Sequence, residues 1–350
     1  MAQSEFLWQQ QPEAEGELQA ILKHACNKNQ TLRQLDHDLI HISSTRLIDW
    51  IDHYSLPMKD ATMKRLTAVG YQTCEDSEKR TVLNHPGAVL PMISLRKDKG
   101  SQTGVAVKVE SIASYQQAHG LSGTIEGSPL SGFRRCLISS EGGVDFYVTE
   151  RRGTRTLDPT FEDSSYLSRY HQASELWKGR ARGLPDSDEA MQRTEACVDR
   201  MVQLVGKDLA AWIAMEGERE YWQGRNTAGH VQKGRQDRLG MGWANHDHHT
   251  FRSSRHFFRH LVNLMEKMGF HCRERFYAGK EAGWGAQVME NSTCGIVLFL
   301  DVDLAPEELH IDFAHDPLPD LGRLGTIGLW CALHGDSVLN AGMHHLEVFF

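Results

Sequence analysis

The fold is indicated by a stretch that occurs twice in the chain, as residues 36–43 (DHDLIHIS) and as residues 247–254 (DHHTFRSS). Each copy has an Asp-His pair, an apolar residue three positions after the histidine and a basic residue four positions after it. Internal repeats of this kind are typical of folds built from related modules. We expect each copy to be a β-strand that leads into a helix.

Alternate side chains of a strand lie on the same face of a sheet. In the first copy this alternation places three residues on one face, which are His37, Leu39 and His41. In the second copy it places four residues on one face, which are His246, His248, Thr250 and Arg252. Imidazoles therefore gather on one side of each predicted strand.

The pattern around the first copy predicts a mixed α and β segment. A short helix is expected over 13–29, a strand over 35–42 and a mostly helical stretch over 46–69. The strands expected next are 71–74, 81–84 and 90–95, and then 104–109, a helix over 111–119, and strands over 133–139 and 144–149. The order strand, helix, three strands is thus expected twice between residues 35 and 151.

Residues 160–224 have apolar side chains at spacings of three and four, which predicts two or three helices. Residues 224–242 are glycine-rich and polar, and we expect a loop there. The first pattern then returns, with a strand over 245–253, a helix over 256–269, and strands over 270–277, 285–289, 295–301, 309–314, 326–333 and 343–350. We therefore divide the chain into an N-terminal helix (1–34), an αβ domain (35–151), a helical insert and loop (152–242) and a second αβ domain (243–350).

The composition of the 350 residues is that of an ordinary globular protein, with 40% hydrophobic and 24% charged residues. The net charge is -8 and no long basic run is present, which argues against a nucleic-acid partner. No stretch is apolar and long enough to span a membrane or to form a signal peptide, so we expect a cytoplasmic protein. The seven cysteines lack a C-x-x-C pair, whereas the nineteen histidines are unusually many.

An Asp-His pair at the start of such a module resembles the vicinal oxygen chelate superfamily. Its members include glyoxalase I, extradiol dioxygenases and 4-hydroxyphenylpyruvate dioxygenase. The resemblance implies an α+β fold with two vicinal-oxygen-chelate-like βαβββ barrel domains, joined here by a helical insert. In that superfamily, a divalent metal is held by the first strand of each module and the last strand of the second.

Two further stretches extend the resemblance. Residues 309–316 (LHIDFAHD) look like the strand that supplies the second histidine in 4-hydroxyphenylpyruvate dioxygenase, and residues 345–349 (HLEVF) look like its closing strand. The resemblance implies that His248, His310 and Glu347 hold the metal, with His246 and His345 as alternative ligands. The looser copy over 35–151 has Asp145 in place of the glutamate, which implies a non-catalytic domain that helps to shape the site.

A second resemblance concerns the sequence His248-x-Thr250-x-Arg252, which is similar to a strand of the 2-oxoadipate dioxygenase/decarboxylase family. That family also combines this fold with extra helices. If it is the nearer relative, His37 becomes an alternative ligand, because it begins the strand equivalent to that of His248.

Two imidazoles and one carboxylate are the ligand set of non-haem Fe(II) oxygenases, and Fe(II) is the metal that we expect. Zinc, nickel and manganese stay open as alternatives, because the ligand types alone do not select the metal. Thr250 and Arg252 share the face of His248, and the guanidinium of Arg252 is suited to bind a substrate carboxylate. The alternative for Arg252 is a salt bridge to a framework acid such as Asp301 or Asp312.

The leading hypothesis is a mononuclear non-haem Fe(II) dioxygenase that uses O₂ and a small carboxylate-bearing substrate similar to a 2-oxo acid. The first alternative is a metal-dependent lyase or isomerase of the glyoxalase kind. The second alternative is a non-catalytic small-molecule-binding protein of the same fold, in which the histidines are structural. The sequence identifies neither the substrate nor the oligomeric state, for which a homodimer stays open.

Overall fold

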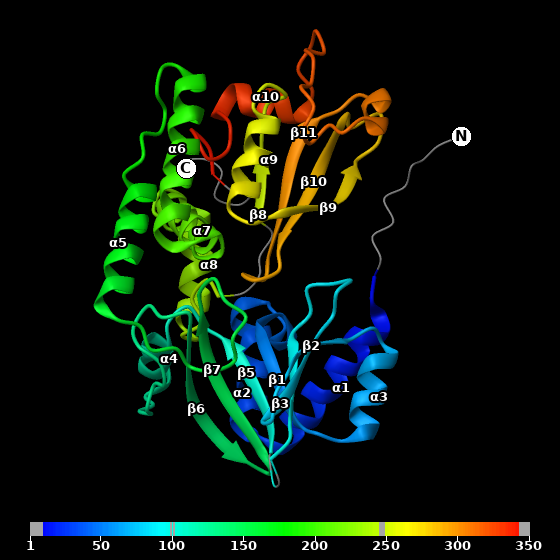
Figure 1. The fold of residues 1–350 in the computed structure, drawn as a ribbon, viewed down its shortest axis with the longest axis vertical. Helices are drawn as coiled ribbons and strands as arrows, with labels where there is room; N and C mark the ends of the chain where they lie inside the picture. The colour runs from blue at the N-terminus through cyan, green and yellow to red at the C-terminus, as the bar shows by residue number, and fades with distance from the viewer. Residues whose placement is uncertain (1–9, 99, 101, 245–248, 343–350) are drawn as a thin grey trace.

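A computed structural model describes residues 10–98, 100, 102–244 and 249–342 of the chain. Two β-sheets lie at opposite ends of the molecule, and a group of helices runs along one side and reaches both (Figure 1). The N-terminal sheet has seven strands and the C-terminal sheet has four. The mixed α+β fold that the sequence predicts is confirmed.

The seven-stranded sheet is made of two similar halves. Its strand order is β2-β3-β4-β1-β5-β7-β6, with β1 parallel to β4, β5 parallel to β7, and β1 antiparallel to β5 at the centre. In each half, the first strand therefore lies beside the last, as in a βαβββ module. The strands are β1 (Ile51–Pro57), β2 (Gln72–Asp76), β3 (Arg80–Asn84), β4 (Met92–Arg96), β5 (Thr103–Lys108), β6 (Phe133–Glu141) and β7 (Val144–Arg151).

Helices cover one face of this sheet. Helix α3 (Asp60–Ala68) follows β1 and helix α4 (Ile112–His119) follows β5, as expected for crossovers between parallel strands. Helix α1 (Pro12–Lys28) packs its apolar side into the same core, which includes Leu18, Trp50 and Tyr54. In the second half, a single bridge between Glu126 and Arg135 stands where the first half has β2.

The strand predicted over 35–42 is wrong. These residues continue helix α2 (Gln30–Asp38) and a π-helical turn (Leu39–Ser43). Leu32, Leu35 and Leu39 are buried at helical spacings of three and four, and the side chain of Asn29 caps α2 by accepting a hydrogen bond from the Leu32 amide. The first module opens instead with β1, inside a stretch that the sequence pattern predicted to be helical.

The C-terminal sheet is one βαβββ module, as predicted. Its strand order is β8-β11-β10-β9, with β8 parallel to β11. Helix α9 (Phe258–Lys267) follows β8 and buries Phe258, Leu261 and Leu264 against the sheet. The strands are β8 (His249–Arg252), β9 (His271–Tyr277), β10 (Trp284–Asn291) and β11 (Ile296–Asp303).

The strands predicted after β11 are not found in the described residues. Residues 309–314 lie in the end of a 3-10 helix (Pro306–His310) and in the turn that follows it, and residues 326–333 lie in α10 (Thr326–His334). The carboxylate of Asp303 accepts hydrogen bonds from the amides of Gly325, Ile327 and Gly328, which caps α10. The strand predicted over 343–350 lies outside the described residues.

The helices predicted between 160 and 224 are confirmed as α5 (Ser164–Lys178), α6 (Ser187–Val205) and α7 (Lys207–Gln223). Their buried residues, among them Trp177, Val198 and Met201, share one core with α9 and the four-stranded sheet. The loop predicted over 224–242 is wrong in part, because residues 227–237 form helix α8 (Thr227–Asp237). The side chain of Asn226 caps the start of this helix. Two glycines within α8, Gly229 and Gly234, made this helix hard to recognise.

Among the described residues, no helix is both long and apolar enough to cross a membrane.

Candidate functional site

The predicted metal ligands are only partly described. Four of them, His246, His248, His345 and Glu347, lie outside the described residues. His310 is exposed at the end of the 3-10 helix Pro306–His310, so the strand on which it was expected does not exist. The triad of His248, His310 and Glu347 therefore stays a prediction.

His37 does not begin a strand. It lies on α2 with its side chain 62% exposed, and its Nδ1 is 3.2 Å from the carboxylate of Asp38. The arrangement in which His37 and His248 open equivalent strands is therefore wrong for His37.

The predicted substrate-binding residues lie on β8. Phe251 is fully buried in the core with α9, so Thr250 and Arg252 point to the opposite face of the sheet. There Arg252 pairs in register with Asp301 of β11, and its guanidinium lies 4.9 Å from the ring centre of Trp330. Burial raises the pKa of Asp301 to about 7, and Arg252 opposes this shift. Arg252 thus has Asp301 as a neighbour, and both its expected substrate contact and the alternative salt bridge stay predictions.

Within the described residues, one group of possible metal ligands comes together, formed by Glu266, Cys272 and His315. His315 uses both ring nitrogens there, with Nδ1 2.7 Å from Asp312 and Nε2 3.0 Å from Glu266. These two carboxylates raise the pKa of His315, which favours the protonated ring. A protonated imidazole cannot bind a metal, so this group is better explained as an ion pair.

A cavity of about 440 Å³ lies on the face of the seven-stranded sheet opposite α1 and α3. Tyr54 and Leu56 are buried in the helix-covered core, so the alternate residues of β1 face this cavity. We call it the open-face cavity. Its polar lining comes from five strands and includes His53, Ser55, Ser94, Arg96, Arg135 and Tyr147.

The basic side chains of this cavity outnumber the acidic ones. Its lining has five lysine and arginine residues and three aspartate and glutamate residues, an excess of two positive charges. Arg80 binds Asp158 through two hydrogen bonds of 2.8 and 2.9 Å, and Arg135 binds Glu126 at 2.9 Å. Arg96 differs from them. Within the described part of the chain it has no carboxylate partner. Its Nη2 donates a hydrogen bond of 2.6 Å to the carbonyl of Gln102, and its Nε is buried without a hydrogen bond.

Tyr147 of β7 lies close to two of these guanidinium groups. The guanidinium of Arg135 lies 5.5 Å from the centre of its ring. Burial and Asp145 raise the pKa of Tyr147, although Arg135 and Arg96 act in the opposite direction. The hydroxyl therefore stays protonated at neutral pH and can donate a hydrogen bond to an anion.

The imidazole of His53 on β1 is hydrogen-bonded to a buried acid, Asp52. Its Nδ1 lies 2.7 Å from Asp52, whose carboxylate also accepts hydrogen bonds of 2.8 and 2.7 Å from Arg151. Burial alone would raise the pKa of Asp52, but Arg151 and His53 outweigh it and hold that pKa well below its usual range. Burial lowers the pKa of His53, and Asp52 only partly opposes this. At neutral pH the site thus holds an ionised Asp52 and a neutral imidazole.

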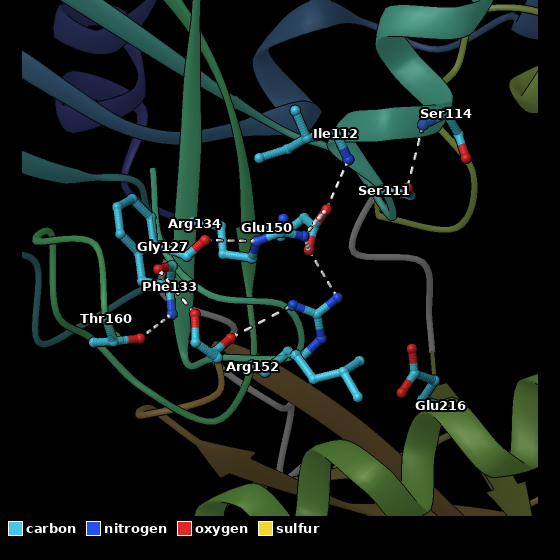
Figure 2. A network of polar contacts seen from close by, with 12 residues as sticks. Ser111, Ile112, Ser114, Gly127, Phe133, Arg134, Glu150, Arg152, Thr160 and Glu216 are labelled. Carbon is cyan, nitrogen blue, oxygen red and sulfur yellow. Dashed lines mark hydrogen bonds and ion pairs between the residues drawn. The ribbon is translucent and has the colours of Figure 1, made fainter. Parts of the chain in front are cut away.

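A second buried acid fixes the neighbouring part of β7. Glu150 accepts hydrogen bonds from the Ile112 amide at the start of α4, from Arg134 of β6 and from Arg152 (Figure 2). This network joins α4, β6 and the end of β7. Because Arg151 lies between Glu150 and Arg152, the same contacts hold it in place beside Asp52.

The open-face cavity does not fit the metal that the resemblance implies. Its wall has one imidazole, His53, on the first strand of the first half, but only Gly104 and Ala106 on β5. His53 of β1, Ala106 of β5 and Tyr147 of β7 lie in register across the sheet. In the same way, Asp145 of β7 pairs with Gly104 of β5. The carboxylate of Asp145 accepts a hydrogen bond from Ser140 at 2.7 Å. Among the described residues, no second ligand joins His53.

No model of a known protein family matches the chain, and a search of the curated proteins finds no match. Among solved structures, a glyoxalase/bleomycin resistance protein/dioxygenase superfamily member from Vibrio splendidus 12B01 matches 28% of this chain and 95% of its own, with 13% identity and a TM-score of 0.22. Glyoxalase I from Zea mays matches 29% of this chain, with 12% identity and a TM-score of 0.21, and the match spans only 42% of its length.

A Mn(II)-bound glyoxalase from Novosphingobium aromaticivorans matches 85% of this chain and 97% of its own, with 13% identity and a TM-score of 0.24. The assignment of the fold rests on the strand order of the two sheets. That order is the one expected for βαβββ modules. The structural neighbours of this α+β chain are members of the glyoxalase/bleomycin resistance/dioxygenase superfamily.

Proposed function

We propose that the protein binds a small carboxylate-bearing molecule in the open-face cavity, with Arg96 as its anchor. One observation carries this proposal. Of the three guanidinium groups on the cavity wall, Arg80 and Arg135 have carboxylate partners, whereas Arg96 has none among the described residues. One N–H of Arg96 Nη2 is used by the Gln102 carbonyl, so a carboxylate would be bound by Nη1 and the second N–H of Nη2, a pair that matches its two oxygens.

The rest of the wall suits the same ligand. A volume of about 440 Å³ is within the range of small-molecule sites. The Tyr147 hydroxyl and the hydroxyls of Ser55 and Ser94 are hydrogen-bond donors on the same wall. The excess of positive charge favours an anion over a neutral molecule of the same size.

This proposal is tested by isothermal titration of the full chain with acetate, pyruvate, succinate and 2-oxoglutarate. We expect at least one of them to bind saturably, and the matching neutral amide to bind at least about tenfold more weakly, because it lacks the charge that Arg96 recognises. The proposal is wrong if no carboxylate binds, or if acid and amide bind equally well.

A second candidate is the mononuclear Fe(II) dioxygenase expected from the sequence, with His248, His310 and Glu347 as ligands. The observation that favours it is the βαβββ module around β8, where Thr250 and Arg252 lie on the face opposite the core. Zinc, nickel or manganese at the same residues would support the glyoxalase-type alternative. Such a metal would supply Lewis-acid or redox chemistry that no side chain supplies.

Metal analysis of protein purified without chelators tests this second candidate. It predicts about one metal ion per chain, lost in His248→Ala, His310→Ala and Glu347→Ala, since all three ligands are required. The matched controls are His249→Ala and His315→Ala, which should keep the metal. Full occupancy in both His248→Ala and Glu347→Ala would exclude the triad, and iron with O₂ uptake would distinguish the dioxygenase from a zinc or nickel isomerase.

A further inference from the structure

We infer that His53 is a general base in the open-face cavity, and that it removes a proton from the carbon next to the carbonyl group of a bound 2-oxo acid. The inference rests on the proposed carboxylate site and adds an activity and a substrate class to it. It assigns chemistry to the N-terminal sheet, and no metal takes part in it.

The ring nitrogen of His53 that does not contact Asp52 lies at the wall of the open-face cavity. Nδ1 of His53 is bonded to Asp52, which leaves Nε2 as the second nitrogen. Nε2 has no hydrogen-bond partner among the described residues. It is also not one of the fully buried polar atoms of these residues, so part of its surface is accessible. Since His53 as a whole is only 7% exposed and lines the open-face cavity, Nε2 borders that cavity.

The imidazole of His53 is held in its neutral form. Asp52 accepts the Nδ1 proton, which fixes the tautomer that carries a lone pair on Nε2. The charged groups that face His53 are Asp52 on its own strand, Arg151 on β7 and Arg135 on β6, and burial together with the two arginines keeps the ring neutral. A neutral imidazole is the form that accepts a proton.

Proton transfer to His53 gives an imidazolium that has a carboxylate beside it. When Nε2 takes a proton, the imidazolium lies 2.7 Å from the ionised Asp52, which stabilises the new charge. Asp52 keeps its own charge because Arg151 binds it through two hydrogen bonds. Asp52 is therefore a positioning residue that acts through His53. A histidine with only a packing role requires neither a buried acid at Nδ1 nor an Nε2 that borders a cavity.

The proposed step is balanced without a co-reactant. The C–H bond next to the carbonyl breaks, its proton goes to Nε2, and its electron pair forms a carbon–carbon double bond. The carbonyl π electrons move to the oxygen, which becomes an enolate. Tyr147 and Arg135, on the same wall as His53, are the donors available to stabilise that oxygen. Return of the proton from His53 regenerates the 2-oxo acid.

The experiment incubates the full chain with pyruvate or 2-oxobutyrate in D₂O and follows the loss of the C3 proton signal by NMR, while binding is titrated in parallel. We expect exchange at least about 100-fold faster than in buffer. We expect His53→Gln to lower the exchange to the buffer rate and to change the dissociation constant by less than about threefold, since Arg96 still anchors the acid. The matched control is His85→Gln, because His85 is similarly buried but lies outside the cavity, bonded to Val69 and Gly87.

The pH profile separates a chemical role from a packing role, even if His53→Gln folds poorly. The exchange rate of the unmodified protein should fall as the pH drops through an inflection below about 6.5, the ordinary pKa of histidine, because burial lowers the pKa of His53. If the acid binds without exchange, or if a folded His53→Gln exchanges at the rate of the unmodified protein, the inference is wrong and the carboxylate site stands. If no 2-oxo acid binds, the inference is wrong, and the carboxylate site is wrong as well if acetate and succinate also fail to bind.

Discussion

Arg96→Met is expected to weaken carboxylate binding by at least about 150-fold. Each hydrogen bond to a charged group contributes about 1.5–3 kcal/mol, so the loss of a two-point contact costs about 3–6 kcal/mol. The substitution removes one exposed hydrogen bond, from Arg96 to the Gln102 carbonyl, but no carboxylate contact among the described residues. Methionine preserves the apolar stem, so the free energy of unfolding should fall by no more than about 1.5 kcal/mol. Calorimetric titration of the tightest-binding acid measures the change.

The matched control for Arg96 is Arg65→Met. Arg65 lies on α3, on the helix-covered side of the sheet, where it is 54% exposed and its Nε is 2.7 Å from Glu17. Its replacement should leave the dissociation constant unchanged within about a factor of two, because an exposed ion pair contributes at most about 1 kcal/mol and is remote from the cavity. Equal weakening in both variants would mean that general charge, and not the position of Arg96, determines binding.

Asp52→Ala is expected to lower the free energy of unfolding by about 3–5 kcal/mol, because it leaves a buried guanidinium without its counter-charge. Asp52 and Arg151 are both almost fully buried and share two hydrogen bonds. The control is Asp49→Ala, three residues earlier, where a 41% exposed carboxylate pairs with a 66% exposed Arg46. That variant should cost less than about 1 kcal/mol in urea unfolding. Equal losses in the two variants would contradict the importance of the buried pair.

The contribution of Asp52 should also depend on pH with a defined sign. Its pKa in the folded protein is well below the ordinary value, so it stabilises the fold above the pKa of the unfolded chain, about 3.9. As the pH falls from there through the folded pKa, this stabilisation is lost. The difference in unfolding free energy between the unmodified protein and Asp52→Ala should therefore shrink below about pH 4. A difference that grows in acid would contradict the assigned direction.

Much of the fold could be predicted from sequence where one periodicity dominates. The strands β3, β5, β7 and β11 and the helices α5, α6 and α7 were predicted because their apolar residues repeat at spacings of two or of three and four. Strand β1 was missed because both of its faces are largely buried and its sequence does not alternate cleanly. Leu47, Ile51 and Tyr54 also fall at helical spacings, which suggested a helix.

The same error misplaced the Asp-His pair of the first module. The Asp-His pair that opens the first module is Asp52-His53, whereas the pair chosen from the sequence, at residues 36 and 37, lies on a helix. A search for every Asp-His pair would have found residues 52 and 53. The other members of the site could not have been found in this way. Arg96, Arg135 and Tyr147 lie on three different strands, and only the topology of the sheet brings them to one cavity.

The most direct test of the carboxylate site is a crystal structure of the full chain with bound pyruvate. We predict electron density for the acid in the open-face cavity, with its carboxylate on the guanidinium of Arg96 and its C3 methyl group facing Nε2 of His53. Density for the acid at another place, or an empty open-face cavity at a pyruvate concentration that saturates binding in solution, would contradict the account.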